Sequence, residues 1–372
     1  MGDVSLTASE TAALEQWVSS NCGERVTNCA VIADGLNLVV GVTTDEGSRY
    51  VVRRPNELRD TPMFVDVETE YRTLNWLAAR GVPVPRPVGR CLDDSVLGAP
   101  FLLATRLEGE EVPLGSRLPQ RYQHPRARER LGHELIDTLA TIHTLPTDPF
   151  EAVCETHTLA EQVAADRARV ERVADSVPAS FTDLLRVGDW LAENVPETDQ
   201  RVLVHGDYRP GNTLFVDAPN EARPAGGDTQ PLPALSGVLD WETPFVGSPL
   251  TEIGYLLLRW RDDGDPTPAL DTVRTHESSE GVPTDLRRAD DAGLAPFTSA
   301  PGSPTRHQLL ARYERHTGRT VSHLTFGIAH AAFTLAAVWC TLHANAGGGA
   351  TGRLPWIDYL RQVAELAIDG EF

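Results

Sequence analysis

The chain has 372 residues, of which 41% are hydrophobic and 23% are charged, so it can form a globular protein with two lobes around a cleft. Acidic residues number 53 against 33 basic ones, for a formal charge of −20, which argues against nucleic acid and anionic membranes as partners. Every basic residue is an arginine and none is a lysine. Together with the acid excess, this favours a halophilic protein that works in a salty cytoplasm.

Other features of the composition exclude further classes. The five cysteines are scattered without a Cys-x-x-Cys pair, which predicts neither a disulfide framework nor a zinc site. No secretory signal is visible in the first residues. The stretch 324–343 is apolar and long enough to span a membrane, but His330 and His343 interrupt it and no basic cluster flanks it. We therefore expect a buried helix there and no membrane partner.

The first hundred residues predict a small mixed lobe. Thr7 and Glu10 have the spacing of a capping box, which predicts a helix directly after them. Three runs rich in β-branched residues and separated by Gly and Asp then predict three strands, over 26–32, 36–43 and 49–53.

A helix and an extended strand are expected next. Apolar residues at helical spacing predict a helix over 67–77, and Gly81-Val82-Pro83-Val84-Pro85 ends it. The apolar segment 100–107 predicts an edge strand that leads into a hinge between the lobes.

The remainder predicts a larger, mainly helical lobe. Apolar residues spaced four, four and three apart from Leu131 predict a long helix that ends near His143. Further helical patterns lie over 160–173, 181–193, 249–257, 306–316 and 357–367. Two polar segments predict loops: a surface hairpin extension over 217–234, and a long insertion over 262–305 of the kind that forms a lid, a binding loop or a disordered insertion.

Two polar islands stand between apolar runs in the centre of this lobe. The first, from His205 to Asn212, is flanked by apolar runs and predicts a strand, a tight loop and a strand. The second begins at Asp240, where another apolar run ends. Asp207 is placed to accept a proton from an attacking hydroxyl, and Asn212 and Asp240 offer the oxygen ligands that Mg²⁺ prefers. Each residue alone is also typical of a turn, but their combination favours phosphoryl transfer.

The run His205-Gly206-Asp207 to Asn212, followed by Leu239-Asp240-Trp241, resembles the aminoglycoside phosphotransferase and choline kinase superfamily. With Glu242 and Gly247-Ser248-Pro249-Leu250, it is most similar to the branch that includes the kinase-like domain of acyl-CoA dehydrogenase fusion proteins. The resemblance implies an α+β, bilobal, protein-kinase-like fold. Residues 1–106 would form a β-rich nucleotide-binding lobe, and residues 107–372 a mainly helical catalytic and substrate lobe.

The resemblance also implies roles for residues outside the islands. Arg53 stands where the superfamily has a lysine that binds the nucleotide phosphates, and Glu70 would hold it, with Glu68 as a competitor. Asn37 would lie in the loop over the nucleotide. Glu252 stands where the family usually has an Asp that supports the catalytic loop.

The predicted reaction moves the γ-phosphoryl group of ATP or GTP to a hydroxyl of a small molecule, with Mg²⁺ and with Asp207 as the base. His205 is expected to fix the loop by hydrogen bonding. Arg209 would reach a substrate anion or the phosphoryl group, or pair with Glu242. The acceptor and the oligomeric state stay open.

Two other functions remain alternatives. A pseudokinase, which binds nucleotide or protein without transferring phosphate, is favoured by Arg53 in place of lysine and by the glycine-poor loop around Asn37. A metal-dependent hydrolase could use the same carboxylates, although no second cluster of His and Asp supports it.

Overall fold

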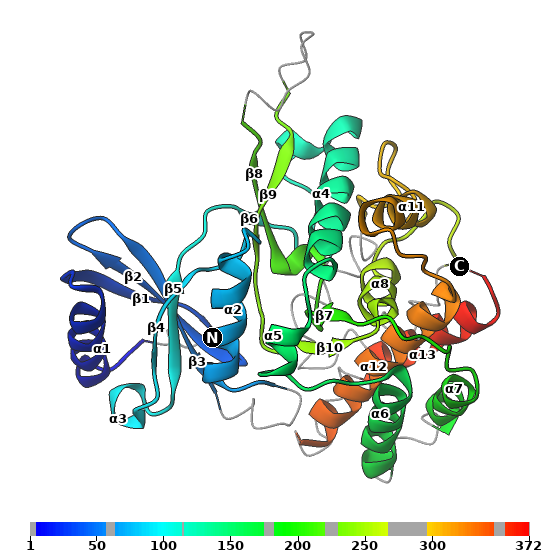
Figure 1. Ribbon diagram of the computed structural model, residues 1–372, viewed down its shortest axis with the longest axis horizontal. Coiled ribbons are helices and arrows are strands. Elements are labelled where there is room, and N and C mark those ends of the chain that lie inside the picture. Colours follow the sequence, from blue (N-terminus) through cyan, green and yellow to red (C-terminus); the bar gives the residue numbers. More distant parts are fainter. Residues whose placement is uncertain are drawn as a thin grey trace. The chain divides into compact units, whose positions relative to one another are not determined.

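The structure is a computed structural model that describes residues 5–56, 64–113, 115–174, 182–219, 230–266, 296–345 and 354–371 (Figure 1). The chain forms two compact units: the first comprises residues 1–109, 152–154 and 236–244, and the second comprises residues 110–151, 155–235 and 245–372. An antiparallel sheet dominates the first unit and helices dominate the second, which confirms the predicted α+β class.

The first unit contains a five-stranded antiparallel sheet in the order β1-β2-β3-β5-β4. Its strands are β1 (Val26–Asp34), β2 (Asn37–Thr44), β3 (Arg49–Pro55), β4 (Pro87–Cys91) and β5 (Phe101–Thr105). The three strands predicted before residue 55 are thereby confirmed. The edge position predicted for 100–107 is wrong, because β4 pairs along the outer side of β5, with Cys91 opposite Phe101.

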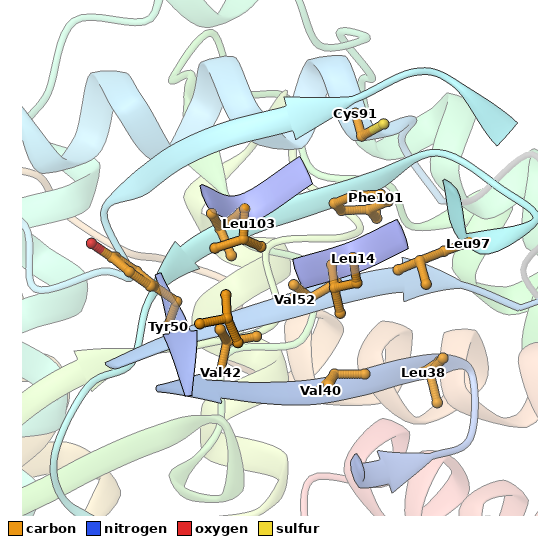
Figure 2. Close-up of a cluster of buried hydrophobic side chains, with 12 residues drawn as sticks. Leu14, Leu38, Val40, Val42, Tyr50, Val52, Cys91, Leu97, Phe101 and Leu103 are labelled. Carbon is orange, nitrogen blue, oxygen red and sulfur yellow. The ribbon is translucent and has the colours of Figure 1, made fainter. Parts of the chain in front are cut away.

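Helices cover both faces of this sheet (Figure 1). Helix α1 (Ala8–Cys22) begins at the predicted capping box, and its Leu14 packs with Val40, Val52 and Phe101, all of them fully buried (Figure 2). The short helix α3 (Asp94–Leu97) adds Leu97 to the same cluster. Because strand side chains alternate between faces, Arg53, which follows Val52, points to the opposite face, toward helix α2 (Val67–Ala78).

The second unit holds the remaining elements. Its helices are α4 (Pro125–His143), α5 (Asp148–Glu151), α6 (Leu159–Val173), α7 (Thr182–Glu193), α8 (Pro249–Leu258), α11 (Arg306–Thr317), α12 (Leu324–Asn345) and α13 (Leu354–Ile368), with 3₁₀ turns at Gln120–Tyr122 and Pro210–Asn212. Strand β7 (Val202–Val204) pairs with β10 (Phe245–Gly247), and β6 (Glu110–Glu111) and β9 (Pro233–Val238) flank β8 (Thr213–Asp217). The predicted helices are confirmed. The hairpin tip and most of the predicted 262–305 insertion lie outside the described residues.

Helix α12 is the segment that the sequence made a candidate membrane span, and it is long and apolar enough to cross one. Its residues Phe333, Ala336 and Cys340 are fully buried, and it packs against α6, α8 and α13. The prediction of a buried helix is thus confirmed. At its crossing with α8 the two backbones touch: a Cβ added to Gly254 would lie 2.2 Å from the carbonyl oxygen of Gly327.

Candidate active site

The first polar island forms the predicted loop between two strands. Strand β7 ends at Val204, the loop carries His205 and Asp207, and a 3₁₀ turn at Pro210–Asn212 leads into β8. Gly206 has a φ of +90°, a conformation that a residue with a side chain adopts only with strain, and it lets the chain reverse directly before Asp207.

Helix α8 supports this loop from behind. Glu252, which is 1% exposed, accepts hydrogen bonds from the backbone N–H of His205 and, at 3.2 Å, of Gly206. Burial raises the pKa of the Glu252 carboxyl to about 7, although these N–H donors act in the opposite direction. On the loop side, Nδ1 of His205 accepts the N–H of Asp207 at 3.2 Å. Glu252 therefore supports the loop as expected, and His205 makes a loop-fixing hydrogen bond of the expected kind.

The Asp207 carboxylate is surrounded by donors, and we call this group the Asp207 cluster. Nε of Arg209 lies 3.0 Å from Oδ1 and 3.2 Å from Oδ2, the Asn212 amide donates to Oδ2 at 2.7 Å, and the Tyr255 hydroxyl donates to Oδ1. Arg259 completes the cluster by donating to the Tyr255 oxygen at 2.9 Å. The side chain of Asp207 nevertheless stays 33% exposed, so a small molecule can reach it.

These neighbours keep Asp207 ionised. Burial alone would raise its pKa, but the guanidinium groups of Arg209 and Arg259 and the hydroxyl of Tyr255 outweigh it and hold the pKa below the ordinary value for Asp. Asn212 gives its amide N–H to Asp207, so its own Oδ1 faces away from that bond and can ligate a cation.

In the first unit, the guanidinium group of Arg53 contacts three carboxylates, and we call this group the Arg53 cluster. Nη1 of Arg53 lies 2.7 Å from Glu70, and Nη2 lies 2.9 Å from Glu242 and 3.0 Å from Asp240. Burial would lower the pKa of Arg53, but the three carboxylates raise it above its ordinary value, so Arg53 stays charged. Glu68, the competitor of Glu70, pairs with Arg90 instead.

The second polar island belongs to this unit, and its backbone is anchored on both sides of Asp240. Trp241 is 1% exposed and its indole N–H donates to the Val238 carbonyl at 3.2 Å, while Val65 donates its N–H to the Glu242 carbonyl at 2.9 Å. Asp240 itself has a φ of +61°, and its side chain is 46% exposed. Such a backbone conformation is held in place by its surroundings and is frequent at binding sites.

The predicted residues thus fall into the two clusters. Asn37, predicted to lie over the nucleotide, donates its side-chain amide to Glu242 at 2.8 Å. No sequence pattern predicted the contact between Glu242 and Arg53 or a role for Tyr255 and Arg259. A signal was present: Glu252 and Tyr255 on α8 and Arg259, the residue that caps its C-terminus, are spaced three and four apart, so they lie on one side of a mainly apolar helix.

The Arg53 cluster suits a divalent cation whose other ligands are phosphate and water. Within the described ranges, no three His, Cys, Asp or Glu side chains come together as a ready-made metal site. Mg²⁺ in nucleotide sites uses only one or two protein oxygens and takes the rest from phosphates and water. The exposed carboxylate of Asp240, in a cluster with an excess of two negative charges, has the required chemistry.

Comparison with known proteins decides the family. A sequence profile of the phosphotransferase enzyme family matches residues 29–292, which is well over half of the chain. The chain belongs to this phosphotransferase family. The predicted enzyme class, a small-molecule kinase, is thereby confirmed.

Acyl-CoA dehydrogenase family member 11 of Gallus gallus is 26% identical over 305 residues, which cover 78% of this chain and 33% of that protein. The chain thus spans about a third of the length of this relative. The matched relatives include acyl-CoA dehydrogenase family members 10 and 11, which carry a kinase-like domain. The predicted branch is thereby confirmed.

Solved structures show the same fold. A presumed aminoglycoside phosphotransferase from Ralstonia eutropha matches with a TM-score of 0.70 at 22% identity, over 96% of this chain and 97% of that one. The complex of APH(2″)-IIia with GDP and kanamycin matches with a TM-score of 0.57 at 14% identity, over 96% and 98% of the two chains. These likenesses confirm the protein-kinase-like fold class.

Proposed function

We propose that this phosphotransferase moves the γ-phosphoryl group of ATP or GTP to a hydroxyl group of a small molecule, with Mg²⁺ and with Asp207 as the base. The Asp207 cluster carries the proposal. It offers an ionised, partly exposed carboxylate that three donors, from Arg209, Asn212 and Tyr255, hold in one orientation. Such a group can orient the acceptor hydroxyl and receive its proton as the phosphoryl group moves in line.

The Arg53 cluster supports the nucleotide side of the proposal. Arg53 is a permanent cation that can bind the phosphates, and Glu70, which is 2% exposed, keeps its guanidinium oriented. Asp240 and Asn212 are the proposed Mg²⁺ ligands, because one offers an exposed carboxylate and the other an amide oxygen on the side away from the N–H that it gives to Asp207. When bound, Mg²⁺ would neutralise the phosphate charge that develops during transfer.

Further support comes from the relatives. The matched APH(2″)-IIia was captured with GDP and kanamycin, and we propose for this chain a corresponding pairing of a nucleotide with a hydroxylated small molecule. The acceptor of this chain is proposed only as a hydroxylated small molecule, and the setting as a salty cytoplasm, in keeping with the acid excess.

A pseudokinase is the second candidate, and one observation favours it. The residue at the phosphate-binding position is Arg53, and both of its terminal nitrogens already lie against carboxylates. A chain that kept the fold but lost transfer could retain this arrangement as a structural element.

Thermal melting tests the proposal. In molar KCl, Mg²⁺-ATP or Mg²⁺-GTP at a hundredfold its dissociation constant should stabilise the wild type by about 2.7 kcal/mol. The shift should vanish in Asp240→Ala and persist in Asp45→Ala, which removes another exposed carboxylate of the same unit. Mg²⁺-dependent phosphate release then separates an enzyme from a pseudokinase. No shift with either nucleotide would overturn the proposal.

A further inference from the structure

We propose that Tyr255 and Arg259 of the α8 segment are positioning residues that hold one oxygen of Asp207, Oδ1, so that the other, Oδ2, receives the proton of the acceptor hydroxyl. The inference deepens the proposed function and rests on it. Neither residue was predicted from the sequence to take part in the reaction, and neither touches the reacting atoms in this proposal.

The direction of the hydrogen bonds is the first argument. A guanidinium group can only donate, so the 2.9 Å contact between Arg259 and the Tyr255 oxygen makes that oxygen an acceptor. The only proton of the Tyr255 hydroxyl then points along its other contact, to Oδ1 of Asp207. Burial also raises the pKa of Tyr255 above its ordinary value, so the hydroxyl keeps this proton and does not act as a base.

The occupancy of the two carboxylate oxygens is the second argument. Oδ1 accepts from Tyr255 and, at 3.0 Å, from Nε of Arg209, which uses both of its lone pairs. Oδ2 accepts one short bond, from Asn212 at 2.7 Å, and only the longer, 3.2 Å branch of the Arg209 contact. Oδ2 is therefore the oxygen that can accept a further proton donor.

The surroundings of Arg259 are the third argument. Arg259 forms no ion pair with any carboxylate in the described part of the chain, and its Nε is buried without a partner. This is unusual in a protein with 53 acidic and 33 basic residues. Its charge is directed instead at the Tyr255 hydroxyl and, through it, at Asp207, which is what a positioning residue requires.

The reaction step follows from this arrangement. The acceptor oxygen forms a bond to the γ-phosphorus of the nucleoside triphosphate, and the bond from that phosphorus to the β-phosphate oxygen breaks. The electron pair of the broken bond stays on the leaving nucleoside diphosphate. The acceptor proton moves to Oδ2 of Asp207, while Tyr255 keeps its own proton and its bond to Oδ1.

Tyr255→Phe tests the inference in the full chain, with Mg²⁺-dependent phosphate release from ATP or GTP as the assay and water as the acceptor. We expect kcat to fall about tenfold, as for the loss of a hydrogen bond to a charged group, with an unchanged KM for nucleotide. Tyr313→Phe is the matched control, because it removes a buried tyrosine hydroxyl bonded to His143 in the same unit, and it should leave both kcat and KM unchanged.

Arg259 gives a second, graded test. Arg259→Lys keeps a donor for the Tyr255 oxygen and should retain most of kcat, whereas Arg259→Met keeps none and should behave like Tyr255→Phe. Equal effects of the two substitutions would contradict a positioning role, as would a kcat of Tyr255→Phe equal to that of the wild type.

The outcomes for the wild type and for Tyr255→Phe separate this inference from the proposed function. If the wild type releases no phosphate from either nucleotide, the proposed function fails and the inference, which rests on it, fails with it. If the wild type releases phosphate and Tyr255→Phe does so with the same kcat, the proposed function stands and the inference is overturned.

Discussion

The two clusters are built with opposite charges. In the first unit, the single cation Arg53 lies among the carboxylates of Glu70, Asp240 and Glu242. In the second unit, the single carboxylate of Asp207 lies near the cations Arg209 and Arg259. One cluster has an excess of negative charge and the other an excess of positive charge.

This difference in net charge indicates a different role for each cluster. An excess of carboxylate around Arg53 would repel nucleotide phosphates unless a divalent cation compensates it, which agrees with the proposed Mg²⁺. An excess of positive charge around Asp207 keeps the carboxylate ionised and attracts the phosphoryl group as its charge spreads in the transition state. Each cluster can be broken by removing its central residue.

Removal of the central acid should have the largest effect. Asp207→Asn keeps the shape of the side chain but cannot accept a proton from the acceptor, so Mg²⁺-dependent phosphate transfer or release should fall about a thousandfold. Nucleotide binding, measured by melting, should persist. The control is Asp217→Asn, since Asp217 also accepts from a tyrosine and an arginine, Tyr122 and Arg121, but lies outside the loop. Turnover by Asp207→Asn within a few-fold of the wild type would contradict the catalytic role.

Removal of the central cation should act on stability as well as on nucleotide affinity. Arg53→Met leaves three carboxylates without their shared partner, and Glu70 is 2% exposed, so the free energy of unfolding should fall by about 3 kcal/mol. The exposed pair of Arg25 with Asp45 provides the control, and Arg25→Met should cost at most about 1 kcal/mol. Urea denaturation measures both. Similar losses in the two variants would show that the Arg53 cluster is not a cooperative unit.

Glu252, the acid that supports the loop, should make the free energy of unfolding depend on pH in the opposite direction to Asp207. Because burial raises the pKa of Glu252 from 4.5 to about 7 in the folded protein, its contribution to stability is greatest below pH 4.5 and decreases as the pH rises to about 7. The effect amounts to at most about 3 kcal/mol. Asp207 has the opposite sign: its lowered pKa stabilises the fold above its unfolded value of 3.8, and this stability is lost as the pH falls.

Glu252→Gln removes the first of these contributions. The difference between wild-type and variant unfolding free energies should therefore decrease from pH 4.5 to pH 7 and stay constant above it. Other titrating groups cancel in this difference. A difference that does not depend on pH would show that Glu252 titrates normally.

Much of this structure was predictable from local patterns. The loop around Asp207 follows from two apolar runs and Gly206, and the capping box fixed the start of α1. The pairing of Arg53 with Glu70 followed from the resemblance and from the distance of Glu70 to the run Val82-Pro83-Val84-Pro85. These features depend on short segments whose periodicity the sequence shows directly.

The features that were missed depend on contacts between distant segments. The interior position of β5 was not visible because the outer partner, β4, is a short strand that begins with a proline. The partnership of Tyr255 with Asp207 joins residues 48 apart, and that of Glu242 with Arg53 joins residues 189 apart. Helical spacing placed Tyr255 and Arg259 on one face but could not say what that face would meet.

The contact of Gly254 with Gly327 fixes the position of α8, the helix that supports the Asp207 loop. Gly254 lies between Glu252 and Tyr255, the two residues that hold the loop and its carboxylate, and its backbone rests directly on that of α12. A methyl group at either glycine would push α8 and α12 apart, and the shift of α8 would move Glu252 and Tyr255 together. Natural variation at position 327 should therefore be restricted as strictly as at many reacting positions, although no reacting group lies there.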